Sequence, residues 1–266
     1  MPVQAVGLRR SVHAEIEVAA AHEAVWEAVA SGPGISAWFV PTDLEPRVGG
    51  KAVSHFAPDG GMDSVATIVQ WEPPRRFVAQ TQEEAGTIDT EWRVDAAGAG
   101  RSRVRVTHSW SADDDRYDAQ FEGYARGWTS FLRILGLYLA HYAGRHGASF
   151  QVMGVADEPV EHAWAAWTGP LCLFGVEAGD DVETADGDAP LAGKVAWTGT
   201  PEAPELVVRL DAPAPGLAHL APHAMSGKVY LAARFYLYGD GAQSKAAQAQ
   251  AAWQAWMDER FGAVGG

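Results

Sequence analysis

The sequence predicts an α+β protein of two tandem domains, each a curved antiparallel sheet covered by a long C-terminal helix. Three observations lead to this prediction: a long helix with an aromatic stripe, strands of strictly alternating polarity, and an order of elements that occurs twice. With 266 residues, the chain is long enough for two domains of about 130 residues each.

The first observation is a run of seven apolar side chains spaced three and four residues apart, six of them aromatic. Because helical residues at this spacing share a face, the run predicts one stripe along a helix of about six turns. Glycines at 123, 127 and 136 lie within the same helix, and each costs roughly 1 kcal/mol relative to Ala. We expect them where the helix lies over a cavity or comes close to the sheet. The stripe consists of Phe121, Tyr124, Trp128, Phe131, Leu135, Tyr138 and Tyr142.

The second observation is the strict alternation of side chains along residues 88–95 and 103–108. Alternation of this kind predicts strands with one face in water and one face covered. Trp92, Val106 and His108 are then expected on the covered face, while opposite charges on the outer faces are expected to meet across strands.

The third observation is a repeat of element order. A strand, a short helix and a Ser-Gly-Pro break at 31–33 are echoed by a strand, a short helix and a Thr-Gly-Pro break at 168–170. Hairpin turns are expected at 59–61 and 186–188, an acidic cap at 113–115, and a final amphipathic helix at 245–261. The predicted domains are residues 1–146 and 147–266.

Composition and charge exclude several classes of function. The net charge of −14 and the lack of a basic stretch argue against nucleic-acid binding and against an anionic membrane surface. No apolar run approaches the ~20 residues that span a bilayer, and the N-terminal residues lack the apolar core of a signal peptide. The single cysteine, Cys172, excludes an intramolecular disulfide framework and predicts a cytoplasmic protein. Its apolar neighbours predict a buried, inert thiol.

Five motifs of the first half carry a family resemblance. They are Trp38-Phe39, Gly49-Gly50, VQWEPPRRF at 69–77, VRVTHS at 104–109 and GWTSFLRILGLYL at 127–139. In this order they resemble the START-like SRPBCC superfamily over residues 12–142, specifically the branch named after the activator of the HSP-ninety chaperone ATPase.

The resemblance implies two tandem helix-grip (START-like, Bet v-like) domains, the second a diverged copy. It further implies a deep cavity between the curved sheet and the long helix. Members of the superfamily bind lipids, hormones or polyketides; some cyclise polyketides, and some contact chaperones.

The candidate ligand-binding residues follow from the expected covered face and from the helix stripe. The stripe residues could stack on a planar ligand or could be ordinary core, and Trp38 and Phe39, after a Gly-Pro-Gly break, could form the rim of an entrance or simply pack. Of the two histidines, His108 could orient a ligand or act as an acid or base, with a hydrogen-bonded core histidine as the alternative. The set is Trp38, Phe39, His55, Trp92, Val106, His108, Tyr124, Trp128 and Phe131.

No metal site and no cofactor are predicted. The His pairs at 141 and 146 and at 219 and 223 lack convergent carboxylates, so solvated histidines are expected there. The chain contains no G-x-S-x-G elbow, Walker loop or dinucleotide fingerprint.

The leading hypothesis is a cytoplasmic protein that binds a small hydrophobic or aromatic ligand in the first domain without catalysis. One alternative is an enzyme of the polyketide cyclase or aromatase type, with His108 or His55 transferring protons. Another is a chaperone ATPase regulator, which is not favoured because the chain begins directly with the START-like strand. A homodimer is left open.

Overall fold

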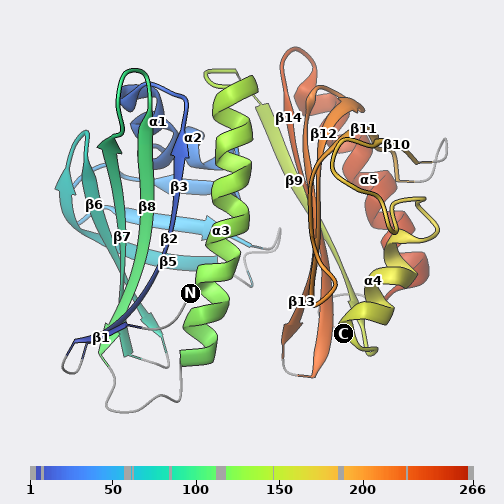
Figure 1. Ribbon diagram of the computed structural model, residues 1–266, viewed down its shortest axis with the longest axis horizontal. Coiled ribbons are helices and arrows are strands. Elements are labelled where there is room, and N and C mark those ends of the chain that lie inside the picture. Colours follow the sequence, from blue (N-terminus) through green and yellow to red (C-terminus); the bar gives the residue numbers. More distant parts are fainter. Residues whose placement is uncertain are drawn as a thin grey trace. The chain divides into compact units, whose positions relative to one another are not determined.

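The computed structural model divides the chain into two compact units, Met1–Gly144 and Arg145–Gly266 (Figure 1). The structure describes residues 4–6, 9–56, 61, 63–83, 86–111, 118–145, 147–184, 189–225 and 227–262. The expected acidic cap at 113–115 and most of the two expected hairpin turns, at 59–61 and 186–188, lie outside these residues.

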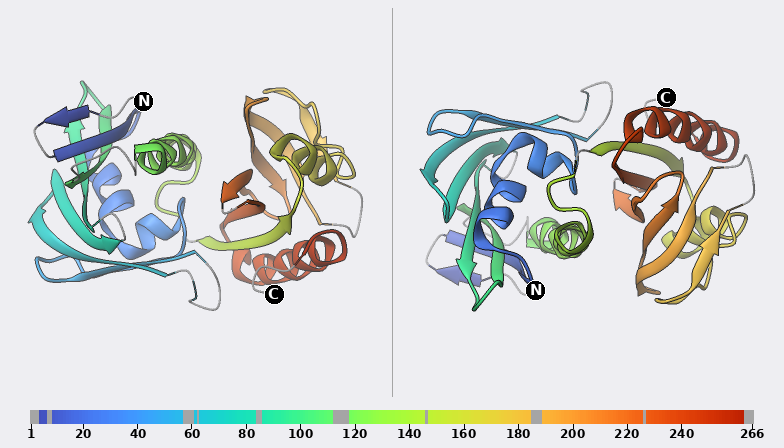
Figure 2. Two further views of the ribbon diagram at one scale, coloured as in Figure 1. Left: turned by 90° about the horizontal axis from the view of Figure 1, so that it is seen from below. Right: turned by 90° about the horizontal axis from the view of Figure 1, so that it is seen from above.

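The first unit contains one antiparallel sheet with the order β1-β2-β8-β7-β6-β5-β4-β3. The long first strand β2 lies beside the last strand β8, so the strands between them form a continuous meander that curls around the helices (Figure 2). The strands are β1 (Gln4–Val6), β2 (Arg9–Val18), β3 (Thr42–Leu44), β4 (Lys51–His55), β5 (Asp63–Glu72), β6 (Arg76–Glu83), β7 (Gly86–Ala96) and β8 (Ser102–Ser111).

The described residues of this unit also form the helices α1 (His22–Ala30), α2 (Gly32–Ser36) and α3 (Asp118–His141). The break between α1 and α2 is built from the predicted Ser-Gly-Pro motif, in which the Ser31 hydroxyl accepts a hydrogen bond from Gly34 N at 3.0 Å. A Cβ on Gly34 would lie 2.0 Å from the Glu27 carbonyl oxygen, so only glycine fits this tight turn.

The predicted alternation of β7 is confirmed. Trp92 is 6% exposed and Val94 is fully buried, while Arg93 between them is exposed on the outer face. On the outer face of β8, the Arg105 guanidinium bonds Glu15 on β2 at 2.5 Å, and Arg103 bonds Glu17. The cross-strand ion pairs of these two arginines therefore run to β2.

The helix stripe divides into two parts along α3. Phe121, Leu135 and Tyr138 are buried in the core, whereas Tyr124, Trp128 and Phe131 are half-buried. Tyr142, the last stripe residue, is buried just beyond the end of the helix.

The helix glycines serve both purposes expected of them. A Cβ on Gly136 would lie 3.2 Å from Ile16 Cδ1 on β2, so this glycine permits close approach of helix and sheet. A Cβ on Gly127 would meet no atom within 4 Å, and one on Gly123 would meet only the Arg126 guanidinium at 3.9 Å. These two glycines lie over open space.

The second unit repeats this connectivity with one antiparallel sheet of order β10-β11-β12-β13-β14-β9. Its first strand β9 again lies beside its last strand β14, and a long helix ends the unit. The chain is therefore α+β with two tandem helix-grip units, as predicted. The elements are β9 (Gly147–Ala156), α4 (Val160–Thr168), β10 (Asp181–Glu183), β11 (Ala192–Thr200), β12 (Ala203–Ala212), β13 (Gly216–Met225), β14 (Lys228–Tyr238) and α5 (Ala242–Arg260).

Large side chains fill the space between the sheet and α5 in the second unit. Phe150 stacks on Phe235 with ring centroids 4.7 Å apart, and Trp253 lies 5.0 Å from Phe235 and is fully buried. Trp167 from α4 joins the same core. The second unit therefore has the same connectivity as the first, and its interior is occupied by large side chains.

Two predictions about the second unit are wrong. Cys172 is exposed, because it has a left-handed backbone (φ 58°) in the turn after α4 that directs its neighbours Leu171 and Leu173 into the core instead. His219 is 2% exposed, because it lies within β13, and its Nε2 is 3.0 Å from the Glu205 carboxylate.

Among the helices of the described residues, none is both long and apolar enough to cross a bilayer.

Candidate functional site: a cavity in the first unit

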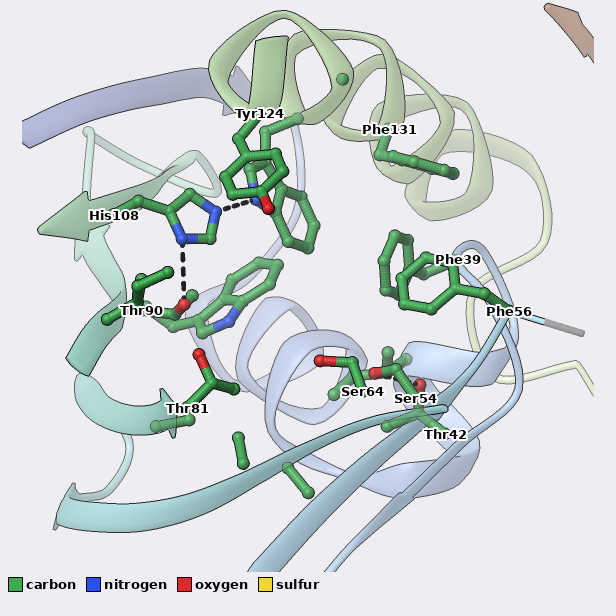
Figure 3. A pocket seen from close by; sticks show the side chains of 18 of the residues that line it. Phe39, Thr42, Ser54, Phe56, Ser64, Thr81, Thr90, His108, Tyr124 and Phe131 are labelled. Carbon is green, nitrogen blue, oxygen red and sulfur yellow. Dashed lines mark hydrogen bonds between the residues drawn. The ribbon is translucent and has the colours of Figure 1, made fainter. Parts of the chain in front are cut away.

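A cavity of about 410 Å³ lies between the curved sheet and α3 of the first unit (Figure 3). Cavities of this size hold small organic ligands. Side chains from α2, from the segment after it, from α3 and from strands β3 to β8 line it. The lining residues are Ile35, Phe39, Thr42, Leu44, Ala52, Ser54, Phe56, Ser64, Ala66, Phe77, Ala79, Thr81, Glu83, Ile88, Thr90, Trp92, His108, Gly123, Tyr124, Gly127, Trp128 and Phe131.

One wall of the cavity is a connected set of aromatic rings. Phe39 stacks on Trp128 with centroids 4.9 Å apart and meets the edge of Phe131 at 4.6 Å. Trp92 lies perpendicular to Trp128 at 4.9 Å, and Phe56 lies perpendicular to Phe39 at 5.7 Å. Edge and offset contacts of this kind hold the rings in place and leave faces and edges for a planar ligand.

The opposite wall is made of small and hydroxyl side chains of the sheet. The register pairs Thr42 with Ser54, Ser54 with Ser64, and Ala52 with Ala66 on β3, β4 and β5. Because side chains alternate along a strand, these pairs place short side chains beside one another on the inner face. The cavity exists because this wall of short side chains lies opposite Gly123 and Gly127 of α3.

His108 connects the two walls through two hydrogen bonds. The indole Nε1 of Trp128 donates to His108 Nε2, and His108 Nδ1 lies 3.0 Å from Thr90 Oγ1. An indole nitrogen can only donate, so His108 Nε2 accepts and the proton of the neutral ring is on Nδ1. Burial lowers the pKa of His108 to about 4, so the ring is neutral near pH 7.

The tyrosine of the helix stripe that lies nearest the cavity is held by a carboxylate. Tyr124 Oη donates a hydrogen bond of 3.0 Å to Glu83 at the end of β6. Glu83 is exposed and Tyr124 is half-buried, so this contact lies where the cavity meets solvent.

The structure brings six of the nine predicted site residues together around the cavity: Phe39, Trp92, His108, Tyr124, Trp128 and Phe131. Two of the others belong to the core and not to the lining. Trp38 is fully buried and its Nε1 donates to the Ala28 carbonyl oxygen at 2.8 Å, and Val106 is 1% exposed on the inner face of β8.

The assignment of His55 to the cavity is corrected. Ser54 faces the cavity, and alternation along β4 therefore directs His55 to the outer face. There His55 bonds Asp63 at 3.0 Å and Asp43 at 3.3 Å. Both hydrogen bonds raise the pKa of His55, and the bond to Asp63 has the larger effect.

The hydroxyl residues of the sheet wall were not among the predicted site residues. Thr42 belongs to the three-residue edge strand β3 and Ser54 to the five-residue strand β4, whereas Ser64, Thr81 and Thr90 belong to the longer strands β5, β6 and β7. The alternation of β7 does place Thr90 on the predicted covered face, between Ile88 and Trp92. A hydroxyl at such a position is a sequence signal for a polar group that faces a cavity.

Within the described residues, no three or more His, Cys, Asp or Glu side chains gather as a metal-binding group.

The family match lies within the first unit of the chain. The model of the family described as polyketide cyclase / dehydrase and lipid transport matches residues 9–132, which confirms the resemblance to the START-like superfamily. No curated protein matches the chain.

Three solved structures illustrate the structural neighbours. The crystal structure of the di-domain ARO/CYC BexL from the BE-7585A biosynthetic pathway has 16% identity and a TM-score of 0.47, covering 96% of this chain and 99% of that chain. DynU16, from the dynemicin biosynthetic locus, has 18% identity and a TM-score of 0.42, covering 93% and 95%. The Aha1 dimer from Colwellia psychrerythraea has 19% identity and a TM-score of 0.42, covering 50% and 98%.

Proposed function

Because the first unit of this chain is a START-like helix-grip domain whose residues 9–132 match the polyketide cyclase / dehydrase and lipid transport family, we propose that it binds a small hydrophobic or aromatic ligand without catalysis. The ligand occupies the cavity between the sheet and α3. The single observation that carries the proposal is the aromatic wall that Phe39, Trp92, Trp128 and Phe131 form on one side of a cavity of about 410 Å³.

The state of His108 favours binding over catalysis. A general base needs a lone pair that can reach the substrate, and the lone pair of His108 Nε2 already accepts from Trp128. The other ring nitrogen is bonded to Thr90. The ring therefore serves as a connector within the cavity wall, and its low pKa keeps it from donating a proton as an imidazolium near pH 7.

Tryptophan fluorescence tests the proposal. Titration with 2-acetylnaphthalene, a neutral aromatic probe, should change the emission saturably, and Trp128→Ala should abolish the change. Trp71→Phe is the matched control, because Trp71 packs against Trp26 outside the cavity lining and its loss should leave the titration intact. Saturable binding that Trp128→Ala leaves untouched would show that the ligand sits elsewhere.

A cyclase or aromatase activity is the second candidate, and the observation that favours it is that a histidine lines the cavity. In this case His108 would have to release Trp128 before taking a proton. Turnover of a synthetic poly-β-ketone followed by product analysis tests it. His108→Ala should then remove turnover while the circular dichroism spectrum remains that of the folded protein; a rate equal to that of buffer for the wild-type protein counts against this candidate.

A further inference from the structure

From the proton positions in the cavity wall, we infer that the Thr90 hydroxyl is the directional hydrogen-bond donor for the ligand, and that the ligand is uncharged and carries a hydrogen-bond acceptor such as a carbonyl. This inference rests on the proposed function and names the ligand class of the same site.

The direction of each hydrogen bond follows from the chemistry of the three side chains. Trp128 has one N–H and no acceptor, so it must donate to His108 Nε2. A neutral imidazole has a single N–H, which is then on Nδ1 and points to Thr90 Oγ1 at 3.0 Å. The oxygen of Thr90 accepts this bond, and its own hydroxyl proton is left to be donated elsewhere.

The Thr90 hydroxyl can donate its proton to an acceptor in the cavity. Thr90 lies on the inner face of β7 and lines the cavity, with its side chain next to His108 in Figure 3. Within the part of the chain that the structure describes, His108 is the one side chain bonded to Thr90 Oγ1. A half-buried hydroxyl proton without an acceptor is costly, so a ligand acceptor placed there gains a full hydrogen bond. The bond is strengthened by the two donors behind it.

The charge of the lining indicates the charge of the ligand. Among the described lining residues, Glu83 is the one that carries a formal charge at neutral pH, since His108 is neutral. A carboxylate or phosphate ligand would therefore enter without a cation to pair with and would meet the Glu83 carboxylate. Burial of such an unpaired anion is unfavourable, so an uncharged acceptor is preferred.

Three naphthalene probes of similar shape separate these contributions in the full-length protein. The probes are 2-acetylnaphthalene, with a carbonyl; 2-ethylnaphthalene, without an acceptor; and 2-naphthoate, with a charge. For the wild-type protein we expect the ketone to bind roughly threefold to tenfold more tightly than the ethyl compound, the usual net worth of one hydrogen bond. The carboxylate should bind at least about tenfold more weakly than the ketone.

Thr90→Val removes the hydroxyl and keeps the branched shape, and it should erase the preference for the ketone over the ethyl compound. Thr90→Ser keeps the hydroxyl and should restore the preference. Thr107→Val on the outer face of the neighbouring strand β8 is the matched control and should behave as the wild type.

The possible results separate a failure of this inference from a failure of the proposed ligand-binding function. A ketone preference that persists in Thr90→Val, or a naphthoate that binds as well as the ketone, overturns the inference and leaves the binding function standing. If none of the three probes binds, or if all bind without any effect of Trp128→Ala, the proposed function fails and the inference fails with it.

A ligand-free measurement checks the proton positions directly. The ¹⁵N chemical shifts of the His108 ring at pH 7 should show a protonated Nδ1 and a bare Nε2. In Trp128→Phe, which removes the indole donor, the tautomer should lose this bias. A wild-type ring protonated at Nε2 would overturn the inference whatever the binding data.

Discussion

The indole N–H of Trp128 on α3 donates a hydrogen bond to Nε2 of His108 on β8. This bond connects the helix to the sheet within the cavity lining. The bond fixes the tautomer of His108, and burial, which lowers its pKa to about 4, keeps the ring neutral near pH 7. A residue that could have been a catalytic base is thereby part of a hydrogen-bonded wall.

Acid should destabilise the protein through His108. The folded-state pKa of about 4 lies below the ordinary value of 6.5, so the unfolded state binds the proton more readily. The stabilising contribution is therefore complete above about pH 6.5 and is lost as the pH falls toward 4. It amounts to roughly 3 kcal/mol at most, from 1.36 kcal/mol for each unit of pKa.

Urea unfolding at pH 7 and pH 5 measures this loss. His108→Gln, which keeps a side-chain amide in the wall and does not titrate, should lose less stability between the two pH values than the wild type does. Equal losses in the two proteins would mean that His108 is not the group responsible.

The two kinds of glycine in α3 should respond differently to alanine. Gly127→Ala adds a methyl group where no atom lies within 4 Å, so it should raise stability by about 1 kcal/mol through helix propensity and weaken ligand binding by narrowing the cavity. Gly136→Ala brings its Cβ to 3.2 Å from Ile16, so its gain should be smaller and ligand binding should not change.

Chemical unfolding and probe titration of the two variants give the comparison. Equal effects of Gly127→Ala and Gly136→Ala on probe affinity would argue against a ligand beneath Gly127.

His55 should titrate at a higher pH than an ordinary histidine and should have no influence on the ligand. Its bonds to Asp63 and Asp43 raise its pKa, so the stability it contributes is present below pH 6.5 and lost as the pH rises through its folded-state value. NMR titration of the His55 ring should show the raised pKa in the wild type and a lower one in Asp63→Asn. His55→Gln should bind 2-acetylnaphthalene as the wild type does, and a change in affinity would contradict its placement on the outer face.

Much of the fold could be predicted because its signals are periodic. The spacing of Phe121 to Tyr142 and the alternation around Trp92 depend on local geometry alone, and both patterns appear as predicted. No strand was expected where β13 lies, because Pro222 is within the run and proline is rare inside strands. The register of β13 with β12 and β14 is set by pairing between distant residues, which no local pattern records.

The candidate site was less predictable for a related reason. Large aromatic residues such as Trp128 are conspicuous, so the aromatic wall could be identified. A cavity is defined equally by small side chains, and Ala52, Ala66 and Ser64 carry no signal until pairing places them side by side. The error at His55 arose from uncertain parity on a short strand, where a shift of one residue exchanges the two faces.

The small residues of the sheet wall should determine whether the cavity is open. Ala66 on β5 faces the cavity, whereas its neighbour Val65 is 52% exposed on the outer face. Ala66→Leu should fill the space next to Ala52 and weaken binding of 2-acetylnaphthalene by at least about tenfold, a loss typical of displacing a ligand from its apolar contact surface. The fold should tolerate the larger side chain, because it enters empty volume and does not overpack a filled core.

Val65→Leu adds a similar apolar side chain to the outer face of the same strand and should leave affinity unchanged. Probe affinity by fluorescence and thermal unfolding of both variants decide the matter: unchanged binding in a folded Ala66→Leu protein would show that the ligand does not occupy the cavity between β5 and α3.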